Sequence, residues 1–189
     1  MDAVSIHKSY QDLSLQEKLK VKDLVDEIWP DSIKEDLNIH FPDTIIESFL
    51  LYDNHELISY VGILQKEIHF LNQTYTIAAL TCVATQNKYR HQGLGLQNIV
   101  YATQWIQANP CIDFGVFSCH HELTQFYIQA GWTKENNAII IANLKDDALS
   151  SKKLGLDVLM MFVSQKALDQ QNELTHYPIN LEFPDGQFI

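Results

Sequence analysis

The feature that most constrains this chain is a pair of glycines in its middle, directly after a segment that reads as a strand. Residues 80–85 form the strand-like segment, and Gly93 and Gly95 open a helix after a short polar loop. Together with Arg90, the glycines have the spacing R-x-x-G-x-G. Glycine lets backbone N–H groups come close to an anion, and the positive end of the helix dipole faces the same anion. The pattern therefore predicts a phosphate-binding turn between a strand and a helix.

The segments before this turn predict helices and then three strands. Ser14 and Glu17 form a capping-box pattern, and the helix that they open ends at Pro30 because proline cannot continue it. A first strand over residues 3–7 precedes this helix, and a short second helix fits the acidic stretch 31–44. The first helix has Leu15, Leu19, Lys22 and Val25 along one side. Runs of β-branched and aromatic residues then predict three consecutive antiparallel strands, over residues 45–52, 57–68 and 75–85.

The segments after the turn alternate between helix and strand. Apolar spacing predicts helices over residues 93–108 and 123–130, and the second of them ends at Gly131. Strands are predicted over residues 114–117, 138–142 and 157–163. The order β-α-α-β-β-β-α-β-α-β-β describes an α/β (α+β) fold, with a mixed, mostly antiparallel sheet flanked by helices. Because no repeat or linker interrupts it, we expect a single domain over residues 1–189.

Composition and charge exclude several classes of partner. The formal charge is −11, whereas binding to nucleic acid needs a basic surface. The three cysteines are odd in number and lack paired spacing, which is typical of reduced thiols, and the run from Cys119 to Glu122 lacks metal-ligand spacing. No apolar run in the sequence has the length of a signal-peptide core or a membrane span. We therefore expect a soluble, cytoplasmic protein without a metal, nucleic acid or membrane partner.

Other phosphate-binding patterns fit less well. A dinucleotide fold has G-x-G-x-x-G after its first strand, whereas this chain has two glycines preceded by three predicted antiparallel strands. The P-loop pattern G-x-x-x-x-G-K-[ST] is absent from the sequence. The later run Phe126-Tyr127-Ile128-Gln129-Ala130-Gly131-Trp132 closes a second strand–helix pair, and this makes the combination more specific than the glycines alone.

Residues 81–95 and 126–132 resemble the GNAT superfamily of acyl-CoA-dependent N-acyltransferases. The first stretch is similar to the pyrophosphate-binding motif A of that family, and the second is similar to its FYxxxGF helix end. The predicted order of elements agrees with the family over the whole chain. Within the superfamily, the length and C-terminal layout look most like the aminoglycoside 2′-N-acetyltransferase group, with the nodulation acyltransferases more distant.

The resemblance implies acetyl-CoA as the donor, bound mainly by backbone groups. Val83, Ala84 and Thr85 would pair with the pantetheine arm, and the N–H of Val83 would polarise the thioester carbonyl. The pyrophosphate would be held by backbone N–H groups of the segment that follows, with added charge from the first side chain. The residues of this segment are Arg90, His91, Gln92, Gly93, Leu94 and Gly95.

Tyr127 is the candidate general acid for the coenzyme A thiolate, because a phenol with a pKa near ~10 can give a proton to a thiolate. It also shares an apolar stripe with Leu123, Phe126 and Ala130, so a purely structural role is the alternative. At the position of the general base, this chain differs from the aminoglycoside group. That group has a glutamate before the pantetheine-binding residues, whereas this chain has Thr81. Threonine is no base near neutral pH, but its hydroxyl group can orient a water molecule.

The acceptor side of the predicted site is open to several interpretations. Asp31, Glu35 and Asp36 are acidic residues that would attract an amine, or they are solvated surface charges. Ser118 and His120 follow the predicted strand 114–117 and are the further candidates for contact with the substrate. His120 or His121 could also replace the missing base, although a structural histidine pair is the competing interpretation. Lys152 and Lys153 stand where the aminoglycoside group has acidic residues, and they would repel a polycation.

We therefore expect an N-acetyltransferase that moves an acetyl group from acetyl-CoA to a primary amine of a small molecule by direct attack. An aminoglycoside is the first acceptor to try. The alternatives are a non-catalytic acyl-CoA-binding module of the same fold and an oxidoreductase that uses a nicotinamide cofactor. The late strand and the tail are placed to complete either an acceptor pocket or a homodimer interface.

Overall fold

The computed structural model describes residues 3–30, 37, 39–41 and 44–189. The chain forms two compact units, and we call Met1–Gln65 with Leu80–Ala102 the first unit. Lys66–Ala79 with Thr103–Ile189 make up the second unit. Three elements pass from one unit to the other: β3 (Glu56–Phe70), β4 (Gln73–Thr85) and α2 (Leu94–Ala108). The expectation of a single domain stays a prediction.

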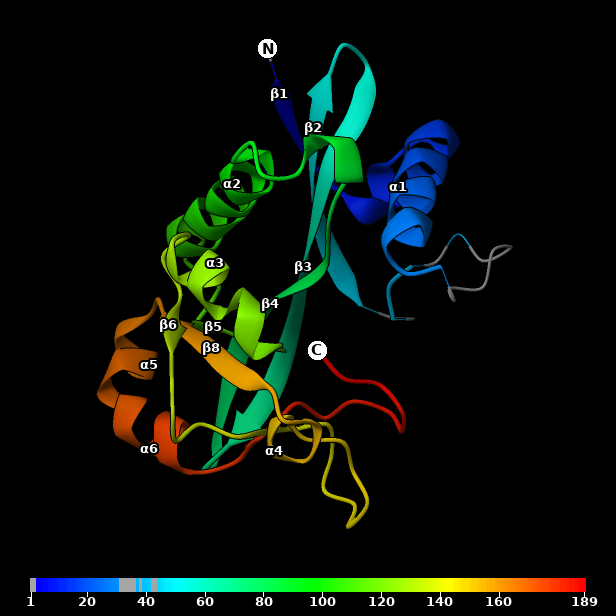
Figure 1. Ribbon diagram of the computed structural model, residues 1–189. Coiled ribbons are helices and arrows are strands. Elements are labelled where there is room, and N and C mark those ends of the chain that lie inside the picture. Colours follow the sequence, from blue (N-terminus) through cyan, green and yellow to red (C-terminus); the bar gives the residue numbers. More distant parts are fainter. Residues whose placement is uncertain (1–2, 31–36, 38, 42–43) are drawn as a thin grey trace. The chain divides into compact units, whose positions relative to one another are not determined.

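The first unit is built from strands with a helix on either side. Strand β1 (Val4–Ser9) pairs antiparallel with β2 (Ile45–Asp53), and β2 pairs antiparallel with β3. Helices α1 (Leu15–Ile28) and α2 lie on opposite sides of these strands (Figure 1). Asn54 and His55, between β2 and β3, both have positive φ, which is the conformation of a two-residue type I′ hairpin turn.

Helix α1 begins as predicted, but only the second half of its predicted stripe, Lys22 and Val25, is buried. Ser14 and Glu17 form the capping box, and the last cap residue directly precedes Pro30. Val21, Leu24 and Val25 are buried, whereas Leu15 and Leu19 are 65% and 44% exposed. The predicted apolar side therefore meets the strands only in the second half of the helix.

The second unit contains the strands and short helices of the C-terminal half. Strand β5 (Phe114–Cys119) pairs antiparallel with β8 (Asp157–Phe162), and β8 also pairs antiparallel with β6 (Thr133–Lys134). Ile77 and Ala78 of β4 pair in parallel with the start of β5. The helices are α3 (Thr124–Ile128), α4 (Ser151–Leu154), α5 (Gln165–Asp169) and α6 (Gln171–His176).

The predicted strand over residues 138–142 is shorter than expected and does not join the large sheet. Only β7 (Ile140–Ile141) forms there, and it pairs in parallel with β9 (Ile179–Asn180) in a separate two-stranded sheet. Helices α4, α5 and α6 were not predicted. They have four to six residues each, so an apolar period cannot be read from them.

Trp132 anchors the core of the second unit. It is 2% exposed, its indole N–H donates to Thr103 Oγ1 at 3.0 Å, and its ring meets the ring of Phe117 edge to face. A Cβ atom at Gly115 would lie 2.7 Å from the Trp132 ring. Glycine at position 115 is therefore needed for this tryptophan to pack against strand β5.

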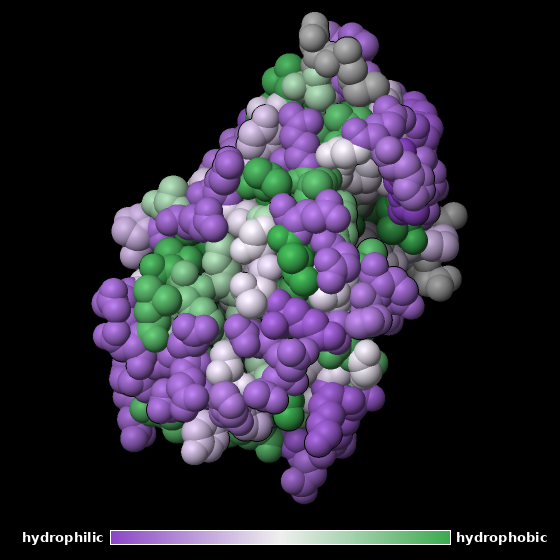
Figure 2. Space-filling view, turned by 60° about the vertical axis from the view of Figure 1, so that its left-hand side comes forward, coloured by the Kyte–Doolittle hydropathy of each residue, from purple (hydrophilic) through white to green (hydrophobic). Residues whose placement is uncertain are grey.

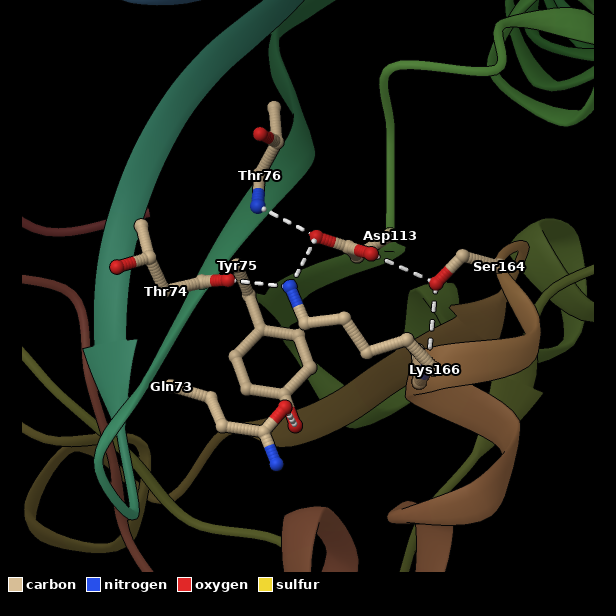
Figure 3. Close-up of polar contacts among 8 residues, drawn as sticks. Gln73, Thr74, Tyr75, Thr76, Asp113, Ser164 and Lys166 are labelled. Carbon is tan, nitrogen blue, oxygen red and sulfur yellow. Dashed lines mark hydrogen bonds and ion pairs between the residues drawn. The ribbon is translucent and has the colours of Figure 1, made fainter.

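A polar cluster around Asp113 ties three segments of the second unit together (Figure 3). The carboxylate accepts hydrogen bonds from Thr76 N at 2.9 Å, Ser164 Oγ at 2.7 Å and Lys166 Nζ at 3.2 Å. Lys166 Nζ also donates to Thr74 O and lies 4.2 Å from the centre of the Tyr75 ring. Burial alone would raise the pKa of Asp113, but the hydrogen bonds from Ser164, Thr76 and Lys166 hold it below its usual value.

The fold class agrees with the sequence analysis. The hydrogen-bonded strand order of the large sheet is β1-β2-β3-β4-β5-β8-β6, in which β4 and β5 run parallel. The fold is a mixed, mostly antiparallel sheet flanked by helices. Hydrophilic residues cover most of the face in Figure 2, and hydrophobic residues lie there in separate small groups. Of the helices described, none is long and apolar enough to cross a membrane.

Candidate functional site

The turn between β4 and α2 contains five consecutive backbone donors that have no acceptor among the described residues. A short 3₁₀ helix, Asn87–Tyr89, leads into it, and His91 and Gly93 have φ values of 60° and 78°. Arg90 N donates to Asn87 O, whereas the next five amides donate to no residue that the structure describes. These are the amides of His91, Gln92, Gly93, Leu94 and Gly95. Consecutive free N–H groups in a turn with left-handed residues, at the start of a 15-residue helix, are an arrangement of donors that suits an anion.

Space in front of this turn is open. Arg90, His91, Gln92 and Gly93 are exposed, and a Cβ atom built on Gly93 would meet nothing within 4 Å. Arg90 Nε donates to Thr85 O at 3.2 Å, which holds the base of its guanidinium group beside the end of β4. Residues 90–93 of the predicted binding segment are thus accessible, whereas Leu94 is buried and Gly95 is half-buried, and the ligand of the turn stays a prediction.

Side chains, rather than the free amides, fix the turn to the rest of the first unit. Asn87 N donates to Glu27 Oε1 at 3.0 Å, and Glu56 accepts from Lys88 Nζ at 2.6 Å and from Tyr89 Oη at 3.1 Å. The Lys88 side chain lowers the pKa of Glu56, so this carboxylate is ionised at neutral pH. The ammonium group of Lys88 is paired with Glu56, so Arg90 is the one of these two basic residues that has no ion pair with a described residue.

Cys82 gives strand β4 an irregular backbone just before the predicted pantetheine-binding residues. Its φ of 50° is left-handed, which is unusual for a non-glycine residue within a strand. The thiol is 3.4 Å from Ile39 O and 3.8 Å from His40 Nδ1, and burial raises its pKa. Sequence reasoning missed this irregularity, because no glycine or asparagine marks the position.

His40 packs beside Thr81, and its place at this site was not predicted from the sequence. Its Nε2 lies 2.7 Å from Tyr60 Oη, and burial lowers its pKa to about 3, so the ring is neutral at pH 7. A Cβ atom at Gly62 would lie 2.8 Å from the His40 ring and 3.0 Å from the Thr81 methyl group. Gly62 therefore lets both side chains approach the middle of β3. Thr81, the predicted water-orienting residue, is half-buried in this packing.

Tyr127 lies on α3 in the second unit, in the apolar surroundings that its stripe predicted. It is 7% exposed and meets the rings of Phe117 and Phe126 edge to face. Its hydroxyl group makes no hydrogen bond to any residue described. Burial, and then the nearby Cys119, raises its pKa well above the usual value. The phenol is therefore protonated at neutral pH, and its hydroxyl group is not used to hold the fold.

Two of the predicted acceptor residues are described, and they lie at the end of β5 and directly after it. Ser118 Oγ donates to Ile189 O at 2.6 Å, and His120 is exposed at the start of a 3₁₀ helix (His121–Leu123). His121, the alternative base, is held by Asp157 at 2.8 Å, a carboxylate whose pKa is lowered by Lys134, Thr124 and His121. Asp31, Glu35 and Asp36 lie outside the described residues. Among the residues that are described, no cluster of three or more histidine, cysteine or acidic side chains could hold a metal ion.

No family model matches the sequence, but solved structures share its fold. An acyl-CoA N-acyltransferase from Pseudomonas aeruginosa matches 84% of this chain and 99% of its own, with a TM-score of 0.59 and 16% identity. An acetyltransferase of the GNAT family from Streptococcus pneumoniae matches 85% of this chain and 100% of its own, with a TM-score of 0.56 and 11% identity. The chain has the GNAT acyltransferase fold.

A third match is longer than this chain. A probable N-acyltransferase from Enterococcus faecalis V583 matches 70% of this chain, with a TM-score of 0.56 and 17% identity. The match covers 33% of that protein, so this chain spans about a third of its length. The GNAT fold agrees with the resemblance seen in the sequence, whereas the aminoglycoside 2′-N-acetyltransferase subgroup stays a prediction.

Proposed function

We propose that this chain is an acetyl-CoA-dependent N-acyltransferase that acetylates a primary amine of a small molecule. The observation that carries the proposal is the row of unused amides from His91 to Gly95 after the irregular strand β4. A diphosphate fits such a row, and a thioester carried by it would run back along Val83, Ala84 and Thr85. Arabidopsis thaliana NAA60 supports the donor: it was solved with acetyl-CoA and matches 85% of this chain and 100% of its own, with a TM-score of 0.55 and 10% identity.

The reaction needs no covalent enzyme intermediate. The amine nitrogen attacks the thioester carbon, whose oxygen would be polarised by the N–H of Val83, and the carbon–sulfur bond then breaks. Tyr127 donates its proton to the departing thiolate and regains one from solvent, while the amine loses a proton to a water molecule that Thr81 orients. Low-polarity surroundings raise the pKa of a phenol and of a thiol alike, so burial does not by itself oppose the transfer.

The acceptor is expected to be an amine of modest basicity. A lysine-like amine is about three pKa units from neutrality at pH 7, which costs roughly 4–5 kcal/mol unless a base removes the proton. An aminoglycoside remains the first compound to try, although the basic residues Lys152 and Lys153 on α4 would oppose a polycation. A panel that spans amine pKa values and follows thiol release from acetyl-CoA tests this directly. Higher turnover of the less basic amines at pH 7 is the expected result.

Replacing Tyr127 with phenylalanine tests whether the chain is an enzyme or a non-catalytic binding module. The phenol makes no hydrogen bond to a described residue, so Tyr127→Phe should leave the melting temperature and the affinity for coenzyme A unchanged. Loss of the general acid should lower kcat by about 100-fold. Tyr75→Phe is the control, because it removes a hydroxyl group of a buried tyrosine in the same unit, whose one hydrogen bond to a described residue is long, 3.4 Å to Gln73 Oε1. Equal kcat for wild type and Tyr127→Phe would remove Tyr127 from the mechanism.

The choice of cofactor is tested by thermal shift. A ligand at about 100 times its dissociation constant stabilises the folded chain by about 2.7 kcal/mol. Coenzyme A should raise the melting temperature and NADH should not. Stabilisation by NADH alone would favour the oxidoreductase alternative. Stabilisation by coenzyme A without turnover of any amine would favour the non-catalytic module.

A further inference from the structure

Ser59 and Asn98 form a fully buried polar pair directly behind the predicted pantetheine-binding segment of β4. Both side chains are 0% exposed. Asn98 Nδ2 donates to Ser59 Oγ at 3.3 Å and to Phe49 O at 3.1 Å, so helix α2 is tied to strands β2 and β3. Ser59 Oγ in turn donates to Ala84 O at 2.9 Å and lies 3.1 Å from Thr85 Oγ1. The pair thus connects the helix that carries the cradle to the main chain at the end of β4.

The bond to Ala84 O sets the direction of one peptide unit. In a trans peptide the carbonyl and the following N–H point in opposite directions, and the described residues contain no cis bond. Because Ala84 O faces Ser59, the N–H of Thr85 faces away from it. Thr85 O accepts from Arg90 Nε at 3.2 Å, which holds the next peptide unit as well. Side chains therefore fix two successive peptide planes in the stretch that would meet the pantetheine arm.

Asn98 places a polar side chain at a buried position that an apolar residue of similar size could occupy. Its Oδ1 is buried and has no hydrogen-bond partner among the described residues. Buried polar atoms are normally paired, and a leucine of similar size would fill the space without leaving an amide oxygen unpaired. Retaining the amide therefore suggests a role for its donor group, which is the one that holds Ser59.

We propose that Ser59 and Asn98 are positioning residues for the donor, which keep the pantetheine-binding main chain of β4 in register with the diphosphate cradle on α2. The inference rests on the proposed use of coenzyme A. Without the pair, the cradle would still hold the diphosphate end, but the peptide groups at Ala84 and Thr85 would lose their fixed direction. The pantetheine arm would then contribute less to binding.

Two ligands and a matched pair of variants test the proposal. Coenzyme A contains both ends of the donor, whereas adenosine 3′,5′-bisphosphate lacks the pantetheine arm. Ser59→Ala should weaken coenzyme A binding about tenfold, the value of roughly one lost hydrogen bond, and leave adenosine 3′,5′-bisphosphate binding unchanged. Ser48→Ala is the control: Ser48 is also 0% exposed, lies on the neighbouring strand β2 and bonds to Tyr60 Oη at 3.1 Å instead. It should leave both affinities unchanged.

A second variant and a thermal melt keep folding separate from positioning. Asn98→Leu should likewise reduce the advantage of coenzyme A over adenosine 3′,5′-bisphosphate while the chain still melts cooperatively. Equal weakening of both ligands by Ser59→Ala, or no weakening of either, would overturn the inference while leaving the proposed function intact. Failure of the wild-type chain to bind coenzyme A would instead overturn the proposed function.

Discussion

Two polar regions of this molecule differ in whether their hydrogen-bonding groups are paired. Around Asp113, in the second unit, carboxylate, hydroxyl and ammonium groups are paired with one another and with the main chain (Figure 3). In the turn from His91 to Gly95, in the first unit, five amides in succession have no acceptor among the described residues. A paired cluster stabilises the fold, whereas unpaired exposed donors add nothing to stability and are available to a ligand.

The largest expected effect is on the unpaired region. Gly93→Trp would put a large side chain into the open space before the cradle, and we expect coenzyme A affinity to fall by at least about 100-fold, since several charge-assisted contacts are lost together. Gly155→Trp is the matched control, because Gly155 also has positive φ and open space at its Cβ position, at the end of α4. Calorimetric titration of both variants should show loss of binding only for Gly93→Trp. Loss in both variants would point to backbone strain instead.

The paired region should respond in stability. Asp113→Ala leaves Ser164 and Lys166 without their shared acceptor, so we expect the free energy of unfolding to fall by about 2–3 kcal/mol. Affinity for coenzyme A, measured well below the melting temperature, should not change. Asp169→Ala removes an exposed carboxylate of α5 that, among the described residues, is bonded to Gln165 alone, and it should cost much less in the same denaturation experiment. Similar losses for both would mean that the Asp113 cluster is not a stabilising centre.

The same cluster should make stability depend on pH. Since the pKa of Asp113 is held below its usual value, the ionised form contributes stability above about pH 4, and this contribution is lost as the pH falls through the lowered pKa. The stability difference between wild type and Asp113→Ala should therefore be largest near pH 7 and shrink below pH 4. Urea melts of both chains across this range measure it, and a constant difference would contradict the assignment.

The smallest expected effect concerns the charge beside the cradle. Arg90 is exposed, so its attraction for a phosphate is screened by solvent and salt. Arg90→Ala should weaken coenzyme A binding about threefold at low salt, and by a smaller factor at high salt. Lys88→Ala should weaken binding less than Arg90→Ala does, because the charge of Lys88 is already paired with Glu56. A larger loss for Lys88→Ala would show that the two basic residues have been given the wrong roles.

The contrast also explains what the sequence could predict. Helix α1 and the strands around the cradle are long enough for capping residues, turns and apolar periods to mark their positions. The cradle itself rests on Gly93, a residue type that stands out in a sequence because few others adopt its backbone conformation. The fold class and the position of the turn could therefore be predicted.

The missed features depend on contacts between residues far apart in the chain. Ser150 and Ser164 cap the starts of α4 and α5, but each helix is too short to show an apolar period. His40 and Cys82 meet through tertiary packing, and neither residue carries a local signal of a left-handed or buried position. Ser59 and Asn98 are likewise paired only by the way that α2 packs on β3.

The most direct test of the central claim is an amide NMR titration of the whole chain with coenzyme A. The unused amides from His91 to Gly95 should show the largest, saturable shifts, and those shifts should also appear with adenosine 3′,5′-bisphosphate. Binding that leaves these five amides unmoved while others shift would contradict the claim that this turn holds the diphosphate.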